Sequence, residues 1–177
     1  MINIDYIDCP YVVSKFEEHD NLKNVLLESI ARIENSVLTD NDQNITNTDW
    51  HIGGYDKKQE YWNILYLPLI EHMKRVYNKL GFSEFSYINY WFQQYYKNSF
   101  HNWHVHGETS WTNIYYIELP NEEVKTNIRN QKTESIVIPD IEEGYILTMP
   151  AILWHCSPIN FGDERKTVIV FNTTTPR

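Results

Sequence analysis

Apolar residues recur at helical spacing in two stretches of the first half of the chain. Asp20 can cap the first helix, whose apolar side chains are Leu22, Val25, Leu26, Ile30 and Ile33. Asp56 and Gln59 form an approximate capping box for the second. Its apolar stripe comprises Trp62, Leu65, Leu69, Met73, Val76 and Leu80. We expect the second helix to bend or break at Pro68 and to end at Gly81, and the polar, turn-rich residues 40–54 to form a loop.

The hydrophobic period changes after Phe85 from helical spacing to the alternation of β-strands. The segments concerned are short, β-branched and aromatic, and are separated by Gly, Pro, Asn and Asp: residues 85–97, 110–119, 134–138, 144–150 and 166–172. Helical patterns do not return between them. The pattern predicts an α+β fold in a single domain, 1–177. Helices over about 1–84 support an antiparallel sandwich or barrel over about 85–173.

Composition narrows the possible partners and the compartment. A formal charge of −9 disfavours binding to an extended nucleic acid, which needs clustered Lys and Arg. No apolar run reaches membrane-spanning length, and the first residues lack the pattern of a signal peptide. Only Cys9 and Cys156 are present, so a disulfide framework is not expected and a reducing cytoplasm is favoured. For a phage-encoded protein this would be the host cytoplasm.

Histidines concentrate in the stretch "HNWHVHGETSW", residues 101–111. In an extended chain, His104 and His106 point to the same face and both imidazoles can reach one point. His155 follows a strong strand and is the third candidate ligand for a first-row metal. Glu108 offers an alternative, because His106, Glu108 and His155 would form a two-histidine, one-carboxylate set.

A cation follows His155 at an interval of ten residues. Arg165 opens the strand "RKTVIVFN", where alternation places Arg165 and Thr167 on one face and Lys166 on the other. A surface ion pair with Asp163 or Glu164 would explain Arg165 alone. Beside a metal-binding histidine, however, its guanidinium is placed to grip the carboxylate of a chelating acid, with the Thr167 hydroxyl next to it.

This series of HxH, a distant His and an Arg about ten residues later resembles the Fe(II)- and 2-oxoglutarate-dependent oxygenases. "WFQQYYKNSFHNWHVHGETSWTNIYYIELP" and "GYILTMPAILWHCSPINFGDERKTVIVFN" resemble more narrowly the small 2-oxoglutarate oxygenases common in tailed phages and marine bacteria. The resemblance covers about residues 87–172. It implies a double-stranded β-helix, a jelly-roll or cupin-like barrel, with N-terminal supporting helices.

The resemblance also implies a set of site residues. His104 and His155 would bind Fe(II), and Arg165 and Thr167 would bind the distal carboxylate of 2-oxoglutarate. Most of the superfamily has Asp or Glu at the position of His106. The metal set that the resemblance to the narrower group implies is His104, His106 and His155, and a shift of two residues would give His106, Glu108 and His155, with Glu108 as the alternative carboxylate ligand. Strand parity suggests five pocket residues: Trp91, Gln93, Tyr95, Tyr115 and Trp154.

The implied reaction uses O2 to convert 2-oxoglutarate to succinate and CO2 while hydroxylating a protein side chain, an amino acid or a small metabolite. Two other interpretations remain at this stage. One is a three-histidine cupin-type dioxygenase or isomerase that needs no 2-oxoglutarate. The other is a non-catalytic β-barrel that binds carbohydrate or protein through its aromatic residues. The sequence leaves the substrate and the oligomeric state open.

Overall fold

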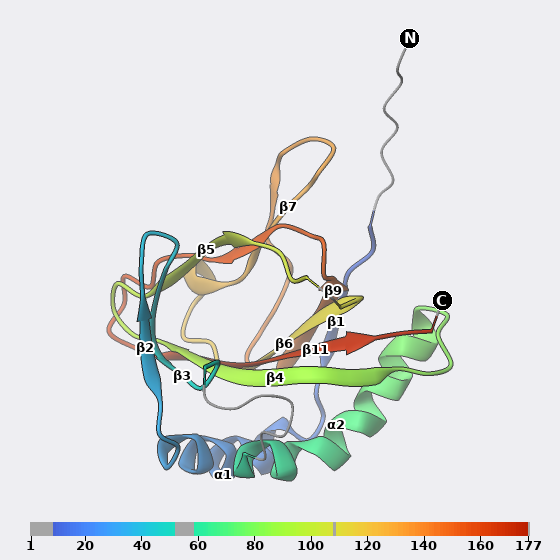
Figure 1. The fold of residues 1–177 in the computed structure, drawn as a ribbon, viewed down its shortest axis with the longest axis horizontal. Helices are drawn as coiled ribbons and strands as arrows, with labels where there is room; N and C mark the ends of the chain where they lie inside the picture. The colour runs from blue at the N-terminus through green and yellow to red at the C-terminus, as the bar shows by residue number, and fades with distance from the viewer. Residues whose placement is uncertain (1–8, 52–58, 108, 177) are drawn as a thin grey trace.

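One antiparallel sheet that curls on itself forms the body of the molecule (Figure 1). The computed structural model describes residues 9–51, 59–107 and 109–176. Eleven described strands are hydrogen-bonded in the order β1-β9-β6-β11-β4-β3-β5-β10-β7-β8, and β2 pairs with β3. The elements are β1 Val12–Lys15, α1 His19–Ala31, β2 Ser36–Thr39, β3 Gln43–Thr48, α2 Glu60–Lys79, β4 Ser86–Tyr95, β5 Phe100–His104, β6 Trp111–Glu118, η1 Glu122–Val124, β7 Asn127–Arg129, β8 Ile136–Val137, β9 Tyr145–Pro150, β10 His155–Ser157 and β11 Lys166–Thr174.

The two helices lie against the part of the sheet formed by β4, β6 and β11, and β5 and β10 lie on the opposite side of it (Figure 1). Leu26 of α1 and Leu65 of α2 pack in one buried cluster with Ile169 and Phe171 of β11. Burial of these side chains, worth about 1.5–3 kcal/mol each, fixes the helices to the sheet. The helices thus cover one face of the sheet and leave its other face to line the inside of the curl.

A second buried cluster fills the inside of the curled sheet. It includes Val168 and Val170 of β11 together with Trp91 of β4 and Ile114 of β6. Successive residues of β11 therefore alternate between the helix side and the interior. Both faces of this strand are buried, and all its residues from 166 to 173 are shielded from solvent.

Both predicted helices are present, with differences at their ends and middle. α1 begins at His19, so Asp20 lies in its first turn, where a carboxylate still favours the helix dipole. α2 continues through Pro68, which the sequence analysis expected to bend or break it. Asp56 lies outside the described residues. Gly81 ends the helix as expected, in the left-handed conformation with φ of 90°.

The first half of the chain contains strands that the hydrophobic pattern did not predict. β1 pairs with β9, and β3 occupies residues 43–48 of the segment that was expected to be a loop. β3 escaped prediction because its side chains are mostly polar. Asn47 donates to Gln94 Oε1 at 3.0 Å and Thr48 donates to the Phe92 carbonyl at 2.7 Å, so hydrogen bonds replace apolar packing.

None of the helices in the described residues is long and apolar enough to cross a membrane.

Candidate metal centre

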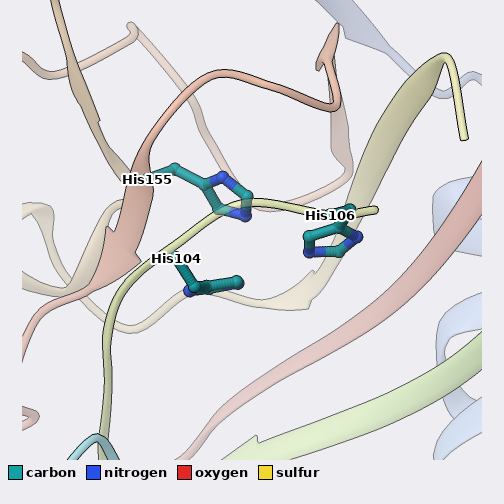
Figure 2. Close-up of side chains that lie close together, drawn as sticks. All are labelled: His104, His106 and His155. Atoms are coloured by element: carbon teal, nitrogen blue, oxygen red, sulfur yellow. The ribbon is translucent and has the colours of Figure 1, made fainter. Parts of the chain in front are cut away.

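Three histidines converge on one point inside the curled sheet. His104 ends β5, His106 follows two residues later, and His155 opens β10. β5 and β10 are paired with His155 directly opposite His104, so the ladder itself brings together residues that are 51 positions apart in the chain. One ring nitrogen from each histidine lies within 4.8 Å of the others. Figure 2 shows the three rings gathered around a common space.

A hydrogen bond to an oxygen acceptor sets the tautomer of each ring. His104 Nδ1 donates to the Asn102 carbonyl at 2.8 Å, and His155 Nδ1 donates to the Leu153 carbonyl at 2.9 Å. His106 Nδ1 donates to Asn172 Oδ1 at 2.8 Å. Because the proton is on Nδ1 in every ring, Nε2 keeps its lone pair. Each ring therefore offers one nitrogen for a metal and uses the other for orientation.

The amide of Asn172 is itself oriented by its neighbours. Asn172 Nδ2 donates to Asn89 Oδ1 at 2.9 Å, and its Oδ1 also accepts from Thr112 Oγ1 at 3.1 Å. These bonds fix the amide oxygen toward His106. Such outer hydrogen bonds orient metal-binding imidazoles and raise their basicity.

Burial keeps the three imidazoles neutral. Loss of hydration lowers the pKa of His106 to about 4 and the pKa of His155 well below its usual value. Burial also lowers the pKa of His104. Neutral imidazole is the form that binds metals, so the group is ready to coordinate at neutral pH.

A cavity extends from these histidines along strands β4 and β11. Its lining includes Trp91, Gln93 and Tyr95 of β4, and Lys166, Val168 and Val170 of β11. The two strands are in register so that Val170 is opposite Trp91, Val168 opposite Gln93 and Lys166 opposite Tyr95. Lys166 and Tyr95 therefore lie at one end of this wall, and Val170 and Trp91 lie at the other end.

Lys166 supplies a buried amino group to the cavity. Its side chain is 1% exposed, and Nζ donates to the Val124 carbonyl at 2.7 Å and to Ser157 Oγ at 2.8 Å. An ammonium has three donors, so one N–H remains. Among the residues that the structure describes, no carboxylate pairs with it, and burial lowers the pKa of Lys166 to about 7. An anion in the cavity would satisfy both its remaining donor and its charge.

Arg165, which immediately precedes β11, and Thr167 of β11 are the residues expected to bind a dicarboxylate, and they lie on the side of the strand opposite to Lys166. Arg165 makes a two-bond ion pair with Glu118, with Nε and Nη2 at 2.7 and 2.8 Å from its carboxylate oxygens. Thr167 also donates to Glu118. Neither residue lines the cavity. Side chains alternate along β11 as expected, but the face that lines the cavity carries Lys166 and not Arg165 or Thr167.

The other candidates divide between the cavity and the rest of the fold. Trp91, Gln93 and Tyr95 line the cavity, whereas Tyr115 and Trp154 do not. Tyr115 lies on the helix side of the sheet, where its hydroxyl is 2.8 Å from His19 Nδ1, and Trp154 is 43% exposed. Glu108 lies outside the described residues, so the alternative ligand set stays a prediction.

Lys166 and His101 are cavity residues that the sequence analysis did not select. The His101 ring stacks on the ring of His104, with centroids 3.8 Å apart and planes at 15°. Cys156, beside His155, also lines the cavity. The signal for Lys166 was its place in the alternation of β11. The signal for His101 was its position three residues before a candidate ligand.

Comparison with known proteins identifies relatives by fold and not by sequence. No family model and no curated protein matches the chain. A crystal structure of an oxidoreductase of the 2OG-Fe(II) oxygenase family from Burkholderia pseudomallei is similar, with a TM-score of 0.76, 11% identity and coverage of 93% of this chain and 85% of that one. A prolyl-4-hydroxylase from Pseudomonas putida gives a TM-score of 0.66, 12% identity and coverage of 93% and 92%. SnoN, an α-ketoglutarate-dependent epimerase of nogalamycin biosynthesis, gives a TM-score of 0.70 and 11% identity, with coverage of 93% of this chain and 76% of that one.

These matches confirm the double-stranded β-helix that the sequence resemblance implied. At identities of 11–12% they establish the fold, and the chemistry has to be argued from the residues of this chain. The narrower resemblance to proteins of tailed phages and marine bacteria stays a prediction.

Proposed function

We propose that the protein is an Fe(II)- and 2-oxoglutarate-dependent oxygenase. One observation carries the proposal: a single cavity contains three neutral, preoriented imidazoles and a buried ammonium that no carboxylate of the described residues pairs with. A dicarboxylic 2-oxo acid can chelate a metal through its 2-oxo acid group, and its distal carboxylate then needs a cation at the other end of the cavity. Structures with this fold include enzymes whose names specify the same co-substrate.

The donor set fits a first-row metal. Three histidine nitrogens would hold Fe(II) and leave coordination positions open for a chelating co-substrate. Bound Fe(II) would supply the activation of O2 that converts 2-oxoglutarate to succinate and CO2 and oxidises a C–H bond of the substrate. The protein holds the rings through Asn102, Asn172 and Leu153, and the buried wall of the cavity excludes water.

The opposite end of the cavity fits the distal carboxylate. We assign this carboxylate to Lys166, in place of the Arg165 and Thr167 pair favoured by the sequence. Ser157 and the Val124 carbonyl hold the ammonium in position. Gln93 accepts a hydrogen bond from Tyr95 OH at 2.8 Å, which leaves its amide N–H groups for an oxygen of the co-substrate.

The finer outcome of the reaction is also a proposal. We propose hydroxylation of a polypeptide side chain, an amino acid or a small metabolite. The names of similar structures include both a prolyl hydroxylase and an epimerase, so the fold accommodates more than one oxidative outcome.

Anaerobic loading tests the function directly. Protein purified without oxygen should develop a weak visible charge-transfer band when Fe(II) and 2-oxoglutarate are added together, and admission of O2 should release succinate. Neither ligand alone should give the band. Absence of the band, together with no thermal stabilisation by the co-substrate, would reject the proposal.

The all-histidine ligand set favours one alternative, a cupin-type dioxygenase that uses no 2-oxoglutarate. Such an enzyme would bind iron and consume O2 in the presence of its substrate without forming succinate. The measurement of succinate against O2 consumed therefore separates the two. A value near one succinate per O2 supports the 2-oxoglutarate mechanism.

Replacing Arg165 with Ala should affect the fold more than the site. Because Arg165 pairs with Glu118 outside the cavity, the affinity for 2-oxoglutarate should stay within about twofold of the wild type. Loss of a half-buried, two-bond ion pair should lower the free energy of unfolding by about 1–2 kcal/mol. Calorimetric titration and urea denaturation measure the two quantities. A large loss of co-substrate affinity in a stable variant would return the carboxylate to Arg165.

A further inference from the structure

The indole N–H of Trp91 is a buried donor without an acceptor in residues 9–51, 59–107 and 109–176. Trp91 is 5% exposed, and its Nε1 is shielded from solvent and has no hydrogen-bond partner among the residues that the structure describes. The Trp91 ring lies against His106, with centroids 5.6 Å apart and planes at 28°. The ring of Trp50 contacts its indole at 4.4 Å between centroids. The indole is therefore packed between the rings of His106 and Trp50.

An unpaired buried indole N–H is unusual because buried Trp nitrogens normally find a partner. In the described part of the chain, buried side-chain groups without partners occur at Ser29, Tyr87 and Trp91. Ser29 lies in α1, and Tyr87 packs in the cluster on the helix side of the sheet. Of these three, Trp91 is the one that lines the cavity with the histidines. The missing acceptor is therefore best sought on a molecule that enters the cavity.

The register of β4 and β11 indicates which end of that molecule would lie beside Trp91. Tyr95 is opposite Lys166, whereas Trp91 is opposite Val170, four residues away along the strand. Trp91 contacts His106, so it marks the metal end of the cavity and Lys166 marks the other end. A dicarboxylate that places one carboxylate at Lys166 presents its 2-oxo acid group toward the histidines and Trp91.

We propose that Trp91 donates its indole N–H to the carboxylate oxygen that the 2-oxo acid places beside His106. This inference rests on the proposed function and adds a specific binding residue to it. The hydrogen bond provides the missing acceptor for a buried donor. It also makes Trp91 select ligands with a carboxylate next to the metal, independently of the selection by Lys166 for a second carboxylate.

The test uses Trp91→Phe, which keeps an aromatic ring and removes the N–H. Trp50→Phe is the matched control, because Trp50 belongs to the same stack and does not line the cavity. The protein is loaded with Zn(II), which is diamagnetic and inert to O2, and titrated with 2-oxoglutarate. The Trp91 indole resonance, assigned by its absence in Trp91→Phe, is followed in nitrogen-15 spectra, and affinities are measured by calorimetry.

We expect the Trp91 indole proton to move downfield as 2-oxoglutarate binds. Trp91→Phe should weaken 2-oxoglutarate binding roughly tenfold, as expected for a hydrogen bond to a charged group, with zinc affinity within about twofold. Trp50→Phe should change neither affinity. If the wild type binds 2-oxoglutarate while the resonance stays in place and Trp91→Phe binds equally well, this inference is wrong and the proposed function stands. If the wild type fails to bind 2-oxoglutarate, both are wrong.

Discussion

Lys166→Met should abolish the preference of the protein for a dicarboxylic co-substrate and leave metal binding intact. Methionine fills nearly the same volume without charge, so the interior stays packed where Lys166 is 1% exposed. The dicarboxylate would lose the cation that faces its distal end. Removal of one member of a buried, hydrogen-bonded charge pair costs about 3 kcal/mol, which corresponds to roughly 100-fold in affinity.

A ligand without the distal carboxylate provides the control for this variant. 2-Oxohexanoate has a methyl-terminated chain in place of the distal carboxylate, so Lys166→Met should bind it as well as or better than the wild type does. Affinities of metal-loaded wild type and variant for both acids form a complete cycle. Equal weakening of both acids would show that the lysine supports the fold of the cavity and does not recognise a carboxylate.

The same lysine predicts a pH dependence of co-substrate binding. Burial lowers the pKa of Lys166 to about 7 in the protein without ligand, and a bound carboxylate would raise it. Below pH 7 the ammonium is already charged, so the affinity should be nearly constant there. Above pH 7 binding has to take up a proton, and the affinity should fall by about tenfold per pH unit until the pKa of the complex is reached. This slope should be absent in Lys166→Met.

His106→Ala should remove metal binding almost completely, whereas Glu108→Ala should leave it unchanged. His106 is held by Asn172 with its other nitrogen near those of His104 and His155. Loss of an outer hydrogen bond alone costs 10- to 100-fold in metal affinity, so loss of the ligand itself should exceed about 100-fold. Competition with a chelating indicator measures both variants.

Exposed His51 provides a matched histidine for this comparison, and His51→Ala should retain full metal affinity. Retained binding in His106→Ala combined with loss in Glu108→Ala would establish the carboxylate set in place of the all-histidine set. The pair of variants therefore decides between the two ligand sets that the sequence left open.

The histidine site could be anticipated because strand geometry is short-range and regular. His104 and His106 share a face of an extended segment, and the spacing of two is visible without a structure. The convergence of His155 depended on the pairing of β5 with β10, which no local pattern contains. The family resemblance supplied that long-range information.

The cation site shows where alternation stops being informative. Alternation correctly separated Lys166 from Arg165 and Thr167, but it could not identify the interior face. A strand with one solvated face reveals its buried side by polarity. β11 is covered by helices on one side and by the curled sheet on the other, so apolar residues occupy both faces. Polarity therefore does not distinguish the two faces of β11, and the resemblance to the oxygenases favoured Arg165.

Residues 43–48 illustrate a different limit. Their polar composition is typical of a loop, yet they form β3 between β4 and β5 because side-chain hydrogen bonds satisfy them there. Such a strand is stabilised by partners that are distant in sequence. Local composition therefore could not predict it.

Lys166 and Asn172 stand six residues apart on β11, so this one strand carries both the amino group proposed to bind the co-substrate and the amide that orients His106. An insertion or deletion of one residue between them would exchange the inward and outward side chains over part of the strand. Either Lys166 or Asn172 would then point away from the cavity, and the strand would lose one of the two functions. Length changes in this segment should therefore be eliminated during divergence even where substitutions at Val168 or Val170 are tolerated.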